Sequence, residues 1–254
     1  MTQDAKPEGG AASAAGDLPL DMRERAGHHT GNPQVVESRL FMQLLVYDSG
    51  PNLDPAVATE RLAGKLGDNG VSAVIYADVH VPTGLGVLTW SEDPAHFVRA
   101  VRPAVVAGGA GLTLRPEMTM LGRTYATGYE PDLRFFLLDR PVSTVQNEQW
   151  PWAVWYPLRR SGAFNRLEGR EQAAILKEHG AIGRAYGDQD LAHDVRLACF
   201  GLDARDNDFV IGLIGKELHP LSHVVQSMRK TRQTSQYIDQ MGPFFIGHVA
   251  RRVP

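Results

Sequence analysis

The chain has 254 residues, a hydrophobic fraction of 43% and a formal net charge of −3 at pH 7. This length suits one large domain or two small ones around a sizeable core. The small net charge argues against binding to nucleic acid or a membrane surface, and no run reaches the ~18 apolar residues that span a bilayer. The single cysteine, Cys199, excludes an intramolecular disulfide and a cysteine-rich metal site.

The first segment, residues 1–38, mixes alanine, glycine, proline and charged residues without an apolar signal region. Such a composition buries too little surface to offset the entropy of ordering, so it predicts a disordered or extended N-terminal arm. His28 and His29 lie in this arm, and we interpret them as a polar pair rather than a metal site. We expect a cytoplasmic protein.

Residues 39–148 predict a strand-helix-strand-strand-helix-strand unit followed by a linker. A short apolar strand covers 40–47, and Asp54-Pro55 then opens a helix that ends at Gly67, with Asp54 as N-cap. The remaining expected elements are strands over 71–79, 86–90 and 112–125, a helix that starts within 91–95 and continues through 96–102, and a linker over 126–149.

Residues 149–254 repeat this order. The expected elements are strands over 152–158, 194–200, 208–214 and 244–249, a helix over 167–179 with Gly180 as its C-cap, and a helix from Pro220 to Tyr237. The clearest internal repeat relates residues 86–102 to residues 209–229. Each segment joins an apolar strand to a helix that starts at a proline and ends in arginine. The sequence therefore predicts an α+β fold of duplicated ferredoxin-like β-α-β-β-α-β repeats, which can form a dimeric α+β barrel within one chain.

Candidate chemistry is concentrated in the second half. His179 lies on a helix stripe with Gln172, Ile175 and Leu176, so it points toward the core, where a neutral imidazole can bind haem iron. The alternative is a cation that the helix dipole stabilises in the last helical turn.

Tyr156 alternates with Trp152 and Val154 on one strand face, and Arg159 and Arg160 follow it. The phenol can be a hydrogen-bonded core group or can pass a proton or an electron. The two guanidinium groups can bind carboxylates or remain solvated at the strand end.

Asp194 and Arg196 share one face of a later strand, where an ion pair within the strand is the structural alternative to a functional role. His193 should face away from them. Farther along the chain, a basic and hydroxyl-rich helix end suits either an acidic ligand or the helix dipole alone. Its members are Arg229, Lys230, Thr231, Arg232, Thr234 and Ser235. His219 and His223 have metal-ligand spacing without a third ligand nearby.

Three motifs over residues 40–250 resemble the chlorite dismutase superfamily of haem proteins, and its coproheme decarboxylase branch in particular. These motifs are Tyr156-Pro157-Leu158-Arg159-Arg160, the run from Glu178 to Arg184 around His179, and Met228-Arg229 with Thr234, Ser235 and Tyr237 before Gly242-Pro243-Phe244-Phe245-Ile246-Gly247.

The resemblance implies a homopentamer and a haem, either iron-coproporphyrin or haem b, with His179 as the proximal iron ligand. It implies that Tyr156 relays a radical to the propionate that is removed. Arg160, together with Arg159, and the group Arg229, Thr234 and Ser235 would contact propionates. Peroxide would oxidise the iron, and loss of carbon dioxide would leave a vinyl group.

The residue opposite His179 stays open. Counting back from the turn at Gly201-Leu202-Asp203 leads to Asp194, whereas Arg196 lies two residues on, and the family's chlorite dismutases use arginine there. Asp194, Arg196 and Tyr156 are therefore the candidate catalytic residues. Coproheme decarboxylation is the predicted function. Chlorite conversion to chloride and oxygen, and haem binding or sensing without turnover, are the alternatives.

Overall fold

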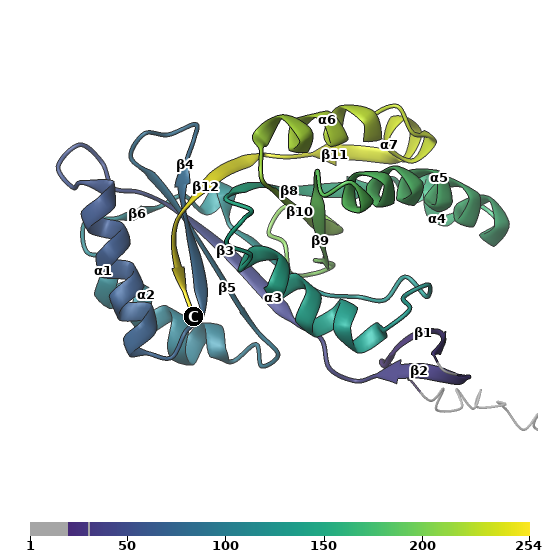
Figure 1. The fold of residues 1–254 in the computed structure, drawn as a ribbon, viewed down its shortest axis with the longest axis horizontal. Helices are drawn as coiled ribbons and strands as arrows, with labels where there is room; N and C mark the ends of the chain where they lie inside the picture. The colour runs from purple at the N-terminus through teal and green to yellow at the C-terminus, as the bar shows by residue number, and fades with distance from the viewer. Residues whose placement is uncertain (1–19, 30) are drawn as a thin grey trace, which may run out of the picture.

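The computed structural model describes residues 20–29 and 31–254, which form a mixed α+β fold with a large antiparallel sheet (Figure 1). The strands are β1 (Glu24–His29), β2 (Asn32–Val36), β3 (Phe41–Asp48), β4 (Ala73–Asp78), β5 (Gly84–Ser91), β6 (Thr113–Leu114), β7 (Met120–Arg123), β8 (Trp152–Arg160), β9 (His193–Ala198), β10 (Phe209–Gly215), β11 (Ile238–Met241) and β12 (Phe245–Val253). The helices are α1 (Pro55–Asp68), α2 (Arg102–Gly108), α3 (Arg140–Val145), α4 (Gly162–Asn165), α5 (Gly169–Asp188), α6 (Leu218–Met228) and α7 (Arg232–Tyr237).

Ten strands form one sheet in the order β10-β9-β7-β3-β5-β4-β12-β8-β11, with β6 on β3. Every neighbouring pair is antiparallel. The first strand of this order, β10, also pairs with β8, the last strand but one. The series of paired strands from β10 to β8 therefore leads back to β10. The strands of the two halves meet at β4–β12 over six residue pairs and at β7–β9 over the single pair Arg123–Ala198.

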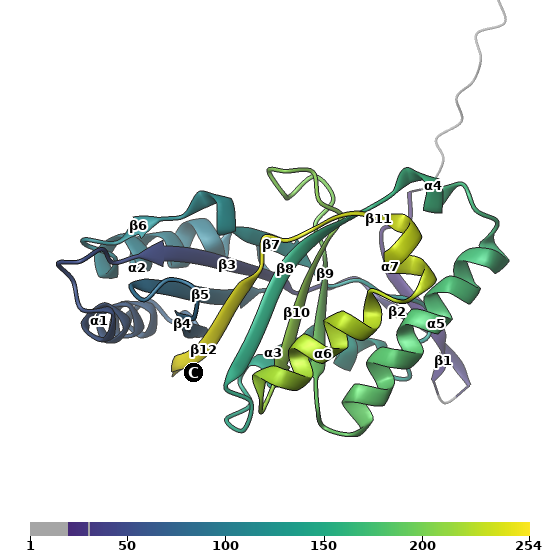
Figure 2. The same ribbon diagram turned by 90° about the horizontal axis from the view of Figure 1, so that it is seen from above.

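The core consists of three apolar clusters that follow this sheet. The central cluster includes Met42, Leu88, Trp155, Val210 and Phe245 and brings together strands from both halves. A second cluster lies between the sheet and the helices α1 and α2, and a third lies between the sheet and α6. The helices of the two halves thus cover different parts of the sheet, as Figures 1 and 2 show.

The central cluster requires a glycine opposite Trp155. Gly212 pairs with Trp155 across β8 and β10, and a Cβ at position 212 would lie 2.6 Å from the indole ring. We expect Gly212→Ala to lower the free energy of unfolding by about 1–3 kcal/mol, because the buried indole cannot move aside without overpacking its neighbours. Urea unfolding measures this, with the open position Gly162→Ala as control. An unchanged midpoint would contradict the tight packing.

The N-terminus of α1 forms as predicted, since the Asp54 side chain accepts a hydrogen bond from the backbone of Ala56 at 2.8 Å. The predicted C-cap of the later helix is wrong. The helix α5 passes through Gly180 and ends at Asp188, because Ile182 and Tyr186 pack against the third apolar cluster and extend the buried face. His179 therefore lies in the middle of a helix rather than in its last turn, which removes the dipole alternative.

Three further expectations need correction. The single helix predicted over 220–237 is two helices, α6 and α7, because the Thr231 side chain caps a new start. The linker over 126–149 contains a π-helical turn (Phe135–Asp139) and α3, whose buried side chains pack against the central cluster. Leu176 is 40% exposed and does not share the buried stripe of Ile175.

The predicted arm is a two-stranded antiparallel hairpin, β1–β2, where the structure describes it. Gln34 anchors this hairpin, because its side chain donates to the carbonyl of Glu130 at 2.8 Å and accepts from the backbone of Leu133 at 2.7 Å. Residues 24–29 and 32–36 are thus extended strands that gain partners from the segment that precedes α3. Residues 1–19 lie outside the described part, and the division into halves at 148/149 stays a prediction.

Candidate functional site

His179 lies on α5 where α7 packs beside it (Figures 1 and 2). Its ring is partly buried, and Nδ1 lies 3.3 Å from the hydroxyl oxygen of Thr231. Burial, together with the positive charges of Arg160 and Arg196, lowers the pKa of His179 from 6.5 to about 4. The imidazole is therefore neutral at physiological pH, which is the form that binds a metal ion.

This low pKa predicts how stability depends on pH. The unfolded chain binds a proton at this histidine near pH 6.5 and the folded chain only near pH 4. The unfolded state therefore holds more protons between these values, and the free energy of unfolding should fall as the pH is lowered through this window. We expect a loss of about 2–3 kcal/mol. Urea unfolding at pH 7 and pH 4.5 tests this, and His179→Gln should lose less than the wild type.

Arg160, at the end of β8, has an environment that is rare for an arginine. Its guanidinium lies between the rings of Phe164 and Phe209, 4.6 and 4.7 Å from their centroids. Its Nε is buried, and no described residue accepts a hydrogen bond from it. Burial lowers its pKa, although the nearby Tyr125 and Asp208 act in the opposite direction. A desolvated guanidinium with an unused donor is suited to an anionic ligand.

Tyr156 lies on the same strand with its ring stacked on Phe244, at 4.6 Å between centroids and an interplanar angle of 26°. Only 6% of the residue is exposed, and Val154 and Leu158 share its apolar cluster. The expected alternation along β8 is therefore confirmed. Burial raises the pKa of the phenol, and the Asp194 carboxylate raises it further. The phenol thus keeps its proton at neutral pH.

Asp194 and Arg196 form the ion pair that alternation along β9 predicts, with Arg196 Nε 2.9 Å from Asp194 Oδ2. Arg140, on α3, completes the group because it donates to Asp194 Oδ1 at 2.7 Å and to the Asp194 carbonyl at 2.9 Å. Burial opposes ionisation of Asp194, but the two guanidinium groups outweigh it and lower its pKa. Asp194 is therefore an ionised carboxylate with its charge balanced by both neighbours.

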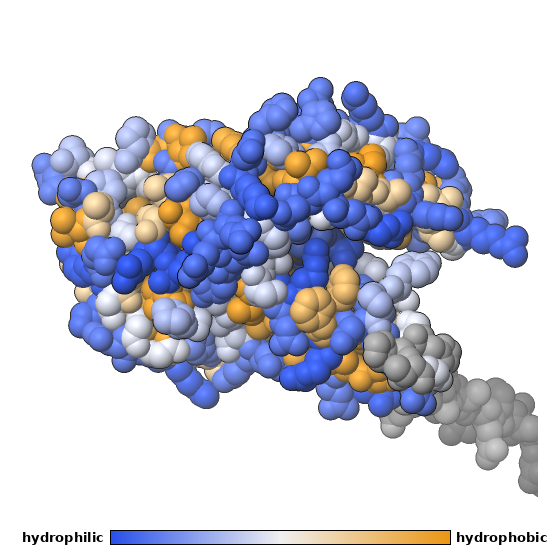
Figure 3. All heavy atoms as spheres, in the orientation of Figure 1, coloured by the Kyte–Doolittle hydropathy of each residue, from blue (hydrophilic) through white to orange (hydrophobic). Residues whose placement is uncertain are grey.

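These two side chains are only partly shielded from solvent. Removal from water is the largest single influence on the pKa of Asp194 and of Arg196, yet 37% and 38% of their side-chain surfaces remain accessible. Figure 3 shows the surface hollowed between the helices α5 and α6 and the part that carries α3 and the hairpin. This hollow, the recess, lies between the helix that carries His179 and the helix that carries Arg140. Arg196 and Asp194 both act on the pKa of His179, and Asp194 acts on that of Tyr156, so their charges lie close to both side chains.

The other predicted residues are placed as follows. Arg159 points away from Arg160 and donates to the carbonyls of Arg205 and Asp206, in the loop between β9 and β10. Arg229 is exposed, and its charge acts on the pKa of Tyr156.

The hydroxyl groups of Thr234 and Ser235 and the ring of His193 also have defined partners. Thr234 Oγ1 lies 3.3 Å from Thr231 Oγ1, and Ser235 donates to the Thr231 carbonyl at 2.9 Å. His193 stacks on Trp150 at 3.6 Å and faces away from Arg196, as predicted.

Sequence reasoning missed the roles of two residues of this site. Thr231 is predicted only as one hydroxyl of the basic helix, although threonine is a preferred residue at a helix N-cap. Arg140 falls in the predicted linker, and it reaches Asp194 across 54 positions. No local pattern carries that contact, because it depends on how α3 packs against β9.

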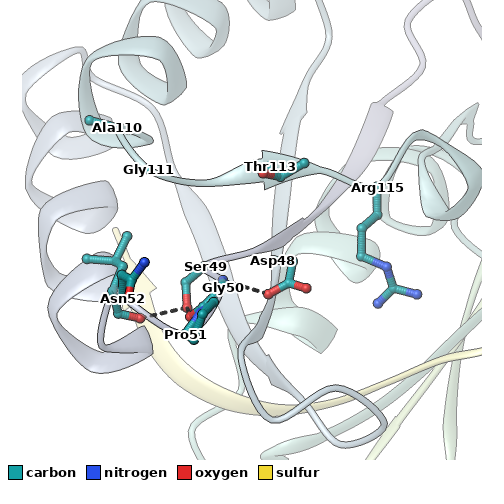
Figure 4. Close-up of a pocket in the computed structure, with 10 residues that line it drawn as sticks. Asp48, Ser49, Gly50, Pro51, Asn52, Ala110, Gly111, Thr113 and Arg115 are labelled. Atoms are coloured by element: carbon teal, nitrogen blue, oxygen red, sulfur yellow. Dashed lines mark hydrogen bonds between the residues drawn. The ribbon is translucent and has the colours of Figure 1, made fainter.

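A second cavity, of about 660 Å³, lies in the N-terminal half between the β3–α1 loop and residues 110–115 (Figure 4). Its charged groups already have partners. Arg115 pairs with Asp78 at 3.0 Å and with Glu117 at 3.1 Å, and Asp48 accepts from the backbone of Gly50 at 2.8 Å. This cavity lacks histidine and tyrosine, so the chemistry expected of the chain points to the recess instead.

Within residues 20–29 and 31–254 there is no cluster of three or more histidine, cysteine or acidic side chains able to hold a metal ion. None of the helices in this described part is both long and apolar enough to cross a membrane.

Two curated relatives resemble part of the chain. They are coproheme decarboxylases from two strains of Thermus thermophilus, and each is 30% identical over 112 residues. The matched region spans 42% of this chain and 43% of the length of each relative.

Solved structures match over a longer stretch. A heme-binding protein from Thermus thermophilus has a TM-score of 0.66 at 18% identity, covering 84% of this chain and 91% of the other. A mutant chlorite dismutase from Candidatus Nitrospira defluvii, solved with cyanide, has a TM-score of 0.66 at 14% identity, covering 85% and 92%. At these identities the likeness establishes a shared fold. The family model for chlorite dismutase matches residues 89–250, well over half of the chain, and the chain therefore belongs to the chlorite dismutase family.

Proposed function

We propose that the recess binds an iron porphyrin, with His179 as the axial ligand of the iron. The side chains fit such a group. His179 is a neutral imidazole on a regular helix, and its Nδ1 already has a partner, so Nε2 remains for a metal. The heme-binding relative from Thermus thermophilus and the three sequence motifs support the same ligand.

The observation that carries this proposal is Arg160. A guanidinium held between two aromatic rings, with a buried Nε that has no acceptor among the described residues, costs stability in the free protein. A porphyrin propionate would supply the missing acceptor. Arg229 and the hydroxyls of Thr234 and Ser235 are proposed for other propionates, and the bonds of Arg159 to loop carbonyls leave it a supporting role.

We further propose that the reaction is peroxide-dependent oxidative decarboxylation of iron-coproporphyrin to haem b. Bound iron would supply the one-electron oxidation by peroxide. Tyr156 keeps its proton and packs tightly on Phe244, so the phenol can give up a hydrogen atom and then recover one from the propionate side chain. Each propionate that loses a hydrogen and carbon dioxide becomes a vinyl group, and its two electrons reduce one peroxide to two waters.

The test is to mix the protein with iron-coproporphyrin and peroxide and follow the porphyrin by mass spectrometry. Stepwise loss of two propionate carboxyl groups is expected, and Tyr156→Phe should stop it while leaving porphyrin binding intact. Persistence of all four propionates, or a fully active Tyr156→Phe variant, would contradict decarboxylation. If the porphyrin binds through His179 without turnover, a haem carrier or sensor is the function.

Chlorite conversion to chloride and oxygen is the second candidate, because the Arg196 side chain is partly accessible to solvent. The ion pair with Asp194 weighs against it, since a neutralised guanidinium attracts an anion less strongly. Chlorite added to the haem-loaded protein tests this candidate. Release of oxygen would support chlorite conversion, and its absence would exclude it. Asp194→Asn should increase any such activity if Arg196 is the group that contacts chlorite.

The finer architecture belongs to the same proposal. We infer that residues 39–148 and 149–254 are duplicated ferredoxin-like repeats whose sheets join as a dimeric α+β barrel, with the porphyrin in the second. The equivalent strand orders β7-β3-β5-β4 and β9-β10-β8-β12 support this inference. A homopentamer is the proposed assembly, and mass measurement of the intact protein in solution tests it.

A further inference from the structure

We propose that Thr231 is the positioning residue of His179. Its hydroxyl would hold the imidazole in the tautomer that carries its proton on Nδ1, which leaves the Nε2 lone pair free for a metal. This inference rests on the proposed function only for the identity of the metal group, because the hydrogen bond belongs to the protein itself.

The direction of the hydrogen bond follows from the contacts of one oxygen atom. Thr231 Oγ1 lies 2.7 Å from the carbonyl oxygen of Met228, which can only accept a hydrogen bond. A threonine hydroxyl has a single proton, which goes to this carbonyl because the only other acceptor oxygen near Thr231 Oγ1 among the described residues, Thr234 Oγ1, is farther away at 3.3 Å. Toward His179 Nδ1, at 3.3 Å, Thr231 Oγ1 must then act as the acceptor. His179 therefore donates from Nδ1.

The helix start that carries Thr231 is fixed in place. Thr231 is 1% exposed, and its hydroxyl also accepts from the backbone N–H of Thr234 at 3.4 Å as the N-cap of α7. The next residue, Arg232, ties this start to α5 at two positions that precede His179. Its side chain pairs with Glu171, and its backbone N–H lies 3.4 Å from the Glu178 carboxylate.

The chemical consequence depends on what kind of acceptor Thr231 is. A hydroxyl oxygen is neutral and draws the Nδ1 proton less strongly than a carboxylate would. An iron bound at Nε2 would therefore meet a neutral imidazole with little imidazolate character. Such a ligand stabilises ferric iron less than an anionic ligand does. With Thr231 as the acceptor, the reduction potential of the bound iron would therefore be higher than with a carboxylate at position 231.

The first test uses the protein without porphyrin. Nitrogen-15 NMR of the ring should show His179 in the Nδ1-protonated tautomer, and His179→Gln identifies the resonance by removing it. Thr231→Ser should keep this tautomer, whereas Thr231→Val should shift the ring to a mixture. A wild-type ring protonated on Nε2, or a Thr231→Val ring unchanged from the wild type, would overturn the inference.

The second test uses the protein loaded with iron-coproporphyrin. Thr231→Val should weaken binding by roughly 10- to 100-fold, as loss of a partner to a metal-bound histidine does. Thr231→Asp keeps a helix cap and places a carboxylate at the same point, so it should lower the reduction potential and raise the iron–histidine stretching frequency.

The two proposals fail in different ways. If Thr231→Val and Thr231→Asp both match the wild type in affinity and spectrum while His179→Ala loses the porphyrin, Thr231 has no positioning role. If His179→Ala binds as well as the wild type, the proposed axial ligand is wrong. In that case the tautomer measurement on the free protein still decides whether Thr231 orients the ring.

Discussion

Replacing His179 by alanine is expected to weaken iron porphyrin binding more than about 100-fold, because residues one hydrogen bond away from a metal already change affinity by roughly 10- to 100-fold. The variant removes the neutral imidazole that burial maintains on α5. Titration of iron-coproporphyrin, followed by the intensity and position of the Soret band, measures the loss.

His223→Ala is the matched control, since this exposed histidine on α6 bonds to Tyr186 instead of facing the recess. It should bind as the wild type does. Added imidazole should restore part of the band in a His179→Gly variant by filling the space of the missing ring. Equal affinity of His179→Ala and the wild type would place the axial ligand elsewhere.

Replacing Arg160 by methionine should weaken porphyrin binding without lowering the stability of the free protein. In the free protein the buried guanidinium gains from the two aromatic rings but loses hydration and leaves Nε without an acceptor among the described residues. Exchange for an apolar side chain of similar length is therefore expected to leave the free energy of unfolding unchanged or to raise it by ~1 kcal/mol. Porphyrin binding should weaken by about 1.5–3 kcal/mol, the usual contribution of a hydrogen bond to a charged group.

Arg159→Met is the comparison for this split. Its guanidinium donates to two loop carbonyls, so its loss should lower the free energy of unfolding by about 1–2 kcal/mol and affect binding less. Urea unfolding of the free proteins and porphyrin titration give the two quantities. Parallel losses of stability and affinity in Arg160→Met would identify this arginine as a structural group.

The sequence predicts side-chain placement best along strands, where successive side chains point to opposite faces of the sheet. Alternation along β9 correctly places Asp194 and Arg196 on one face and His193 on the other. The same reasoning places Tyr156 with Val154, because successive residues of a strand must point to opposite faces. These relations follow from the backbone alone.

The errors arise where packing between elements decides the outcome. Gly180 has the sequence signature of a helix end, but its backbone stays helical because the later residues Ile182 and Tyr186 are partly buried against the third apolar cluster. The contacts of Arg140 with Asp194 and of Thr231 with His179 have no local signal, since each joins residues about fifty positions apart. Haem as the ligand comes from the resemblance of motifs, while the unused donor of Arg160 is visible only in three dimensions.

The two junctions between the halves of the sheet differ greatly in strength. Six residue pairs join β4 to β12, whereas Arg123 and Ala198 alone join β7 to β9. Local opening requires the fewest broken hydrogen bonds at the weaker junction, and β9 carries Asp194 and Arg196. Amide hydrogen exchange should therefore be faster along the outer edge of β9 than along β12. The strand that carries Asp194 and Arg196 would then also be the one that can yield while a large flat ligand enters.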